Sequence, residues 1–498
     1  MNRRQVLLNA ATTFAQVIGS AATLFFLYRF LVRTIGVQGL GIWSLVLATT
    51  SVVTLANQGF SASIVKFVAK YVAHQRIEEV SVLIQTTLIS IALAIFAISL
   101  ALYPCARWLL ALVLPAGHLA DALGILPYAL ASLWINVVGG TLLAGLAGHE
   151  LITYRNYVVL GGSLLFLLMS FALVPRYGLL GLAYSQIMQS GASFLATWFL
   201  LRRKIPQLPF LPRRWDRSLF REMFSYGIQF QFITASQALR EPVTKALLTK
   251  FGGLALTGFY DMASRWVFTF RELIVQANLV LVPTVSGLKE RDPASIPGVY
   301  RQSYRLIFFL AIPTFAFLLV ASPIVSFIWL GHSEPVFVLF VALLAAGWFV
   351  NVLSNPAYVV NLGTGALRWV SIGCAATALL NPILGFIAGK YFGGEAVVAA
   401  SVFSLIVGYA IVLVSYHFEN RVSFDQLLPR DSIGILVCSL AGALIFLPYF
   451  SRTRMQSLFS LRLASIGTLA LLTIVVIPMW VHPMRKRLIH WVFSRLPA

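Results

Sequence analysis

Ionisable side chains recur within residues 229–276, a stretch that otherwise has the apolar character of membrane helices. An ionisable group at membrane depth costs several kcal/mol unless it faces protein or water, so its default role is functional. These residues predict a polar pathway through the membrane with a surplus of positive charge. They are Arg240, Glu241, Lys245, Asp261, Arg265, Arg271 and Glu272.

The spacing of these residues gathers them into stripes. At about 100° per residue of a helix, four polar positions of 256–283 fall within roughly 60° of one another, and a similar stripe lies on 223–249. Two such stripes predict an aqueous, charged cavity inside a helix bundle. The alternative is that pairs such as Asp261 and Arg265 only staple helices together. The two sets are Asp261, Arg265, Glu272 and Gln276, and Gln229, Gln237, Arg240 and Thr244.

A cationic cavity selects anions, and arginine pairs with phosphate through two parallel hydrogen bonds. The cations therefore predict a site for a phosphate or pyrophosphate head group. For Arg29 and Arg33 the alternative is that they reach the membrane interface from the end of their helix. The candidate site residues are Arg29, Arg33, Arg240, Lys245, Arg265 and Arg271. The acids Glu241, Asp261 and Glu272 are candidates for coupling transport to H⁺ or Na⁺.

The elements that must position these residues are membrane helices. The chain has 498 residues, of which 59% are hydrophobic and 11% charged, whereas ordinary soluble domains carry about 25% charge. A net charge of +21 would suggest a nucleic-acid partner in a soluble protein. Here most of the charge lies in short loops, where Lys and Arg mark the cytoplasmic face. We therefore expect an all-α polytopic membrane protein with no nucleic-acid partner.

Apolar runs long enough to cross a bilayer, which takes about 20 residues, predict fourteen transmembrane helices. Roughly 24 of the 37 Lys and Arg residues then fall on the side of the N-terminus, which places both termini in the cytoplasm. The first run is too long for a signal peptide and is expected to be retained. The spans are 5–32, 39–57, 80–103, 122–144, 155–174, 181–201, 223–249, 256–283, 304–322, 335–358, 369–389, 395–416, 433–449 and 463–481.

The chain repeats itself after about 215 residues, which is the signature of a duplicated architecture. Three landmarks recur in the same order. An even number of spans per copy gives two parallel lobes related by an axis along the membrane normal, an arrangement suited to alternating access. The paired landmarks are Arg29 and Gly36 with Lys245 and Gly252, Trp134 and Asn136 with Trp348 and Asn351, and Arg176 and Gly178 with Lys390 and Gly393.

The predicted domain organisation follows from this repeat. Residues 1–201 form an N-terminal lobe of six helices, and 223–417 form a C-terminal lobe of six. Residues 202–222 are a basic cytoplasmic connector between them. Helices 13 and 14, with a basic cytoplasmic tail, occupy 418–498 outside the repeat.

Motifs of catalytic, nucleotide-driven or metal chemistry are not found in the sequence. There is no phosphate-binding Gly-Lys-Ser/Thr loop, His-Glu-x-x-His or Cys-x-x-Cys, and three scattered cysteines offer neither a disulfide framework nor a metal site. A membrane glycan polymerase or transferase would be expected to carry acids on a sizeable outer loop. Here Glu334 and Glu395 are isolated carboxylates near the outer face. We therefore expect no cofactor and no enzymatic activity, with a polymerase or transferase as the less favoured alternative.

Several stretches resemble the bacterial polysaccharide transporters of the multidrug/oligosaccharidyl-lipid/polysaccharide exporter (MOP) superfamily. They are residues 27–45 (LYRFLVRTIGVQGLGIWSL), 59–71 (GFSASIVKFVAKY), 178–183 (GLLGLA) and 258–265 (GFYDMASR). The resemblance implies a flippase of the bacterial inner membrane that moves an undecaprenyl-pyrophosphate-linked oligosaccharide, the repeat unit of O-antigen, capsule or exopolysaccharide. It also implies membrane lipids, a coupling ion and polysaccharide polymerase machinery as partners.

Two other branches of the superfamily remain alternatives. The lipid II flippases are similar around Tyr260–Arg265 and Val282–Ser286, and their cavity arginine would fall on Arg265, but they carry arginines in mid-helix 1 where this chain has Ala21 to Leu27. The cation-coupled multidrug antiporters have twelve helices and a less cationic lumen. The missing arginines argue against the lipid II branch, and the fourteen predicted spans argue against the multidrug branch.

Overall fold

The computed structural model describes residues 3–51, 63–65, 67–72, 74–279, 281–423, 429–441, 458–483 and 485. Within them the regular secondary structure is helical throughout. Among the described residues, eight helices are long and apolar enough to cross a membrane, which confirms the prediction of an all-α polytopic membrane protein. The count of fourteen spans and the side on which the termini lie stay predictions.

The chain divides into two compact units, residues 1–250 and 251–498. The first contains α1 (Arg3–Ser51), α3 (Ile77–Val113), α4 (Ala116–Gly148), α5 (Ile152–Lys204) and the part of α6 (Arg217–Leu279) that precedes residue 251. The second contains the rest of α6, α7 (Val282–Arg291), η2 (Pro293–Ser295), α8 (Ile296–Leu330), α9 (Pro335–Thr364), α10 (Arg368–Phe392), α11 (Gly394–Glu419), η4 (Arg430–Ser432) and α13 (Leu458–Val481). The predicted lobe boundaries stay a prediction.

Single glycines divide the longest helical runs and let the chain change direction without a loop. Gly36 in α1, Gly178 in α5 and Gly253 in α6 have φ of 73°, 57° and 81°, and Gly393 between α10 and α11 has φ of 85°. Their ψ values, from 172° for Gly36 to −130° for Gly178, lie outside the left-handed helix in a region that is essentially restricted to glycine. These runs are therefore pairs of helices joined at a glycine.

The glycine turns carry the repeat seen in the sequence. Gly36 matches Gly253 and Gly178 matches Gly393, each at a separation of about 216 residues, which is a separation typical of a duplicated architecture. In the third turn the residue with positive φ is Gly253, one position after the Gly252 that aligns with Gly36. Both copies thus interrupt their helices with a glycine of positive φ at matching places.

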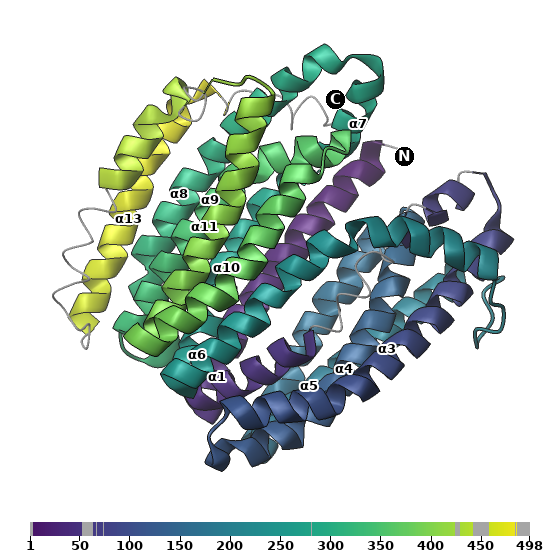
Figure 1. Cartoon of the computed structure of the whole chain (residues 1–498), viewed down its shortest axis with the longest axis horizontal. Helices are drawn as coiled ribbons and strands as arrows, with labels where there is room; N and C mark the ends of the chain where they lie inside the picture. The colour runs from purple at the N-terminus through teal and green to yellow at the C-terminus, as the bar shows by residue number, and fades with distance from the viewer. Residues whose placement is uncertain are drawn as a thin grey trace. The chain divides into compact units, whose positions relative to one another are not determined.

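The core of the first unit is built from α3, α4, the end of α5 and the segment that follows α5. It includes Leu83, Leu142 and Trp198, and it continues into Ile205 and Leu208 of that segment and into Met223 of α6. In the second unit α9 packs against α8 and α11, α10 packs against α11, and α13 lies along α8 (Figure 1). The apolar, close-packed helices of each unit provide the rigid elements that hold the polar side chains.

Candidate anion-binding site

Arg271 is held by two hydrogen bonds between α6 and α9. Its Nε donates to Oδ1 of Asn351 over 2.7 Å, and its Nη1 donates to Oε2 of Glu272 over 2.7 Å. The arginine side chain is 15% exposed, and Asn351 is 4% exposed. Charge-assisted hydrogen bonds of this kind are about twice as strong as neutral ones. The guanidinium therefore has a defined position within the second unit.

Two aromatic rings complete the surroundings of this guanidinium. Its central carbon lies 5.4 Å from the ring centroid of Phe268 and 5.0 Å from that of Trp348, and the two rings meet edge to face at 5.5 Å. A cation over an aromatic face gains roughly 0.5 kcal/mol at an exposed site and about 2 kcal/mol when desolvated. The rings stabilise the positive charge without using any of its hydrogen-bond donors.

The donors that remain on Arg271 define what the site can do. A guanidinium carries five N–H groups, and the contacts with Asn351 and Glu272 engage one on Nε and one on Nη1. Within the described part of the chain, the other three form no hydrogen bond. A rigid, partly desolvated guanidinium with open donors is suited to a phosphate oxygen pair.

A polar seam between α6 and α9 continues beyond this arginine. Asn278 donates to Oδ1 of Asn355 over 2.6 Å and accepts from Ser303 of α8 over 2.6 Å. Asn278 and Asn355 are 1% and 4% exposed. Buried polar groups that satisfy one another rigidify their helices, so the seam fixes the register between α6 and α9 beside Arg271.

The remaining predicted residues of the second unit differ in exposure. Glu272 is 35% exposed at its side chain and accepts from Gln276 as well as from Arg271. Asp261 is 2% exposed, whereas Arg265 is exposed. The structure thus brings Arg271 and Glu272 into direct contact and places Asp261 in the interior.

The predicted residues of the first unit lie on α1 and on the first part of α6. Lys245 is 2% exposed and pairs with Oε1 of Glu241 over 2.7 Å, one helical turn away. Arg240 is half-buried, and Arg29 and Arg33 are exposed on α1. The side chain of Gln229, a member of the predicted stripe on 223–249, lies outside the described residues. The carboxylate of Glu241 thus neutralises the charge of Lys245, the most deeply buried of these cations.

Three residues around Arg271 were absent from the predicted site. From the sequence, Asn351 and Trp348 are identified only as landmarks of the repeat, and Phe268 has no distinguishing signal. The available signal was an asparagine and a tryptophan within one helical turn of each other at membrane depth, because a buried amide needs a polar partner.

Comparisons with known proteins agree with this architecture. The sequence profile of the family described as "Polysaccharide biosynthesis protein" matches residues 30–333. A search among curated proteins gave no match.

Solved structures show the same fold at low sequence identity. A multidrug resistance MATE family transporter of the MOP superfamily, in an inward-facing conformation, has a TM-score of 0.71 at 15% identity, covering 80% of this chain and 96% of its own. The lipid II flippase MurJ, in an inward closed conformation, has a TM-score of 0.71 at 13% identity, covering 95% and 98%. A MOP superfamily transporter from Pyrococcus furiosus has a TM-score of 0.61 at 14% identity, covering 84% and 95%.

Proposed function

This chain belongs to the family of polysaccharide biosynthesis proteins, and from that premise we propose that it is a flippase for an undecaprenyl-pyrophosphate-linked oligosaccharide. The coarser function is that of a multi-pass membrane transporter of the MOP superfamily, as the family and the fold together indicate. The proposed substrate is the lipid-linked repeat unit of O-antigen, capsule or exopolysaccharide. The proposed mechanism is alternating access in the bacterial inner membrane.

The observation that carries the proposal is the geometry of Arg271. A pyrophosphate offers several anionic oxygens, and a guanidinium with three open N–H groups can bind two of them in its own plane. Low exposure of the arginine, 15% at its side chain, strengthens that attraction, since charge pairs gain energy as water is excluded. Arg240, Lys245 and Arg265 are the further candidate cations for the head group, and the prenyl tail would stay in lipid.

Glu272 offers a route to ion coupling in this proposal. It holds one N–H of Arg271 over 2.7 Å, so a phosphate that takes over this donor would leave the carboxylate without its cation. We therefore propose Glu272 as an acid that couples substrate binding to H⁺ or Na⁺ at adjacent residues. Glu241 beside Lys245 has the same arrangement in the first unit, and Asp261 is the third candidate.

The decisive experiment is flipping by the purified chain in proteoliposomes. A fluorescent undecaprenyl-pyrophosphate oligosaccharide is placed in both leaflets, and a membrane-impermeant reductant bleaches only the outer label. Wild-type protein should render nearly all label accessible, whereas Arg271→Ala and Arg265→Ala should leave the inner half protected. Asn136→Ala, at the asparagine of the repeated landmark in the other copy, is the control. Full accessibility with both arginine variants would reject the site.

Competing substrates separate this proposal from its alternatives. In the same vesicles, lipid II that flips as fast as the oligosaccharide carrier would assign the chain to the lipid II branch. Uptake of an organic cation that tolerates Arg265→Glu would instead favour a multidrug antiporter. Polymerised or transferred glycan made by the purified chain alone in detergent would indicate an enzyme. In cells, Arg271→Ala should abolish surface polysaccharide while the protein still inserts.

A further inference from the structure

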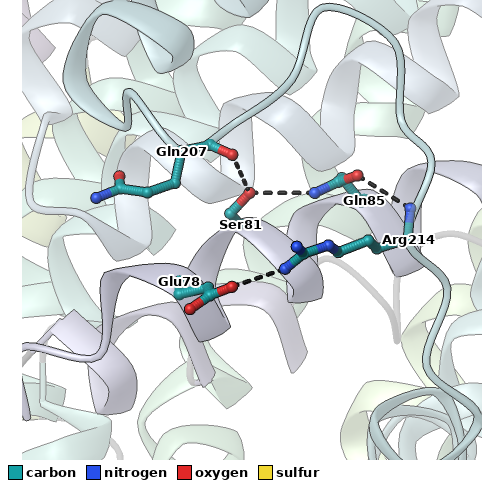
Figure 2. Close-up of polar contacts among 5 residues, drawn as sticks. All are labelled: Glu78, Ser81, Gln85, Gln207 and Arg214. Atoms are coloured by element: carbon teal, nitrogen blue, oxygen red, sulfur yellow. Dashed lines mark hydrogen bonds and ion pairs between the residues drawn. The ribbon is translucent and has the colours of Figure 1, made fainter.

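Residues 205–216, which we call the connector strap, run from the end of α5 to the start of α6 and are fastened to α3 (Figure 2). Oε1 of Gln85 accepts from the backbone N–H groups of Arg213 and Arg214 over 2.9 and 3.1 Å. Ser81 donates to the carbonyl of Gln207 over 3.0 Å and accepts from Gln85 over 3.1 Å. Gln85 is 2% exposed, so the strap is bound to the interior of the first unit.

More contacts secure both ends of the strap. Trp215 donates from Nε1 to Ser90 over 2.9 Å, and the backbone N–H of Asp216 donates to Thr86 over 3.1 Å. Ile205 and Leu208 are buried in the core of the first unit. The inner face of the strap is thus satisfied by protein, and its course is fixed although it contains three prolines.

The outer face of the strap has a different character. Phe210 is 70% exposed, Leu211 is 60% exposed and Trp215 is 49% exposed. Cations surround these apolar side chains, and residues 202–222 hold seven Lys or Arg against two acids. The exposed cations are Arg203, Lys204, Arg213, Arg214, Arg217 and Arg221.

We propose that the connector strap is an interfacial anchor, which inserts Phe210 and Leu211 among the head groups of anionic phospholipids while the cations pair with their phosphates. The strap directly follows α5, a helix long and apolar enough to cross a membrane, so we place its exposed side chains at the head-group layer. Exposed aromatic and aliphatic side chains among Lys and Arg are the composition of interfacial anchors, and basic segments next to membrane helices are attracted to anionic lipids. This proposal is independent of the transported substrate.

The charge and the rigidity of the strap favour anionic lipid over other binding partners. A local excess of cations complements an anionic surface, and side chains held on a fixed backbone lose little conformational entropy on insertion. Arg214 is paired with Glu78 over 2.7 Å, so it contributes less charge than its neighbours. Arg203, Arg213 and Arg217 are the cations assigned to the lipid phosphates.

The test measures the depth of a spin label on the strap in nanodiscs of defined composition. In a cysteine-free chain, Phe210→Cys carries the label, Leu211→Cys is the second site, and Gln207→Cys on the same strap is the reference. In bilayers containing phosphatidylglycerol, labels at 210 and 211 should collide with lipid-dissolved oxygen, whereas the label at 207 collides with an aqueous nickel complex. Unchanged melting temperatures show that the strap still folds.

Two comparisons make the outcome decisive. The lipid contact at position 210 should be lost in pure phosphatidylcholine and in the Arg203→Gln, Arg213→Gln, Arg217→Gln variant. Equal access of the aqueous nickel complex to labels at positions 207 and 210 would overturn the proposal of an anchor. A label depth that is the same in anionic and neutral bilayers would overturn it as well. Protection that requires an added soluble protein would overturn it too, by showing a protein partner instead.

Discussion

The clamp around Arg271 makes a quantitative prediction about binding of the pyrophosphate head group. Replacing Asn351 with Ala removes the acceptor that holds Nε at 2.7 Å but keeps the charge. The ligand must then immobilise a mobile arginine, which costs about 0.5–1.5 kcal/mol, or about 2- to 13-fold in Kd. Arg271→Ala removes the charged donor, worth about 1.5–3 kcal/mol per hydrogen bond, so Kd should rise about 10- to 150-fold.

The repeat supplies a matched control for this series. Asn136 is the asparagine of the same landmark in the first copy, one residue nearer its tryptophan than Asn351 is, and it donates to Ser190 over 2.7 Å rather than accepting from an arginine. Asn136→Ala should therefore leave Kd unchanged, although it costs some stability. Arg271→Lys keeps the charge without the planar fork, and its Kd should lie between those of wild type and Arg271→Ala.

The assay is binding of undecaprenyl pyrophosphate to the purified chain in detergent, with undecaprenol as the ligand that lacks the head group. Only the pyrophosphate should distinguish the variants. Arg271→Ala that binds as tightly as wild type would refute the assignment of this residue. Asn136→Ala and Asn351→Ala with equal losses would show that both asparagines act through stability alone.

Three further predictions concern stability, each followed by the melting temperature of the purified chain. Gly253→Ala should destabilise by about 1–3 kcal/mol because its φ of 81° is strained for any other residue. Gly191→Ala, in a helix with equally open space around the added methyl, should instead stabilise by about 0.5–1 kcal/mol, and shifts of equal sign would contradict the argument. Gln85→Leu should destabilise the protein by about 1–3 kcal/mol per backbone N–H left unpaired and make the connector strap sensitive to protease. Gln207→Leu changes an exposed side chain and should have neither effect. Burial lowers the pKa of His482 below its ordinary 6.5, so the folded state favours the neutral ring. The melting temperature should therefore fall as the pH drops from 6.5 through the lower pKa of the folded state. His482→Gln should remove that pH dependence.

The fold was largely predictable because its determinants are local and repeated. Apolar runs, glycines at matching positions and the excess of cations in short loops are all readable along the chain. The turn at Gly252 and Gly253 shows the limit of this reading. Two adjacent glycines both permit positive φ, and packing beyond the sequence decides which one adopts it. Alignment with Gly36 alone therefore places the turn one residue early.

The connector strap was predicted only as a basic connector, because its fastening depends on distant residues. Gln85 lies within a predicted membrane helix about 130 residues before the backbone groups that it binds. The polar run of Ser81, Gln85 and Thr86 in an apolar helix was the available signal, since a buried amide in a membrane helix marks a packing partner or a function. The sequence does not identify the partner of Gln85, because hydropathy gives no distances between residues.

The two copies of the Trp–Asn landmark show how a duplicated fold acquires one charged site. In the first copy, Trp134 donates to the carbonyl of Ala92 over 2.9 Å and Asn136 donates to Ser190, so both side chains bind neutral groups of neighbouring helices. In the second copy Trp348 and Asn351 surround the guanidinium of Arg271. The repeated Trp–Asn pair can therefore either link helices through neutral hydrogen bonds or stabilise a guanidinium. The presence of Arg271 determines the second role. A cation needs partners that stabilise it at low exposure, and a duplicated pair of polar residues already supplied them. The difference between the two copies then follows from one arginine beside a repeated pair of residues.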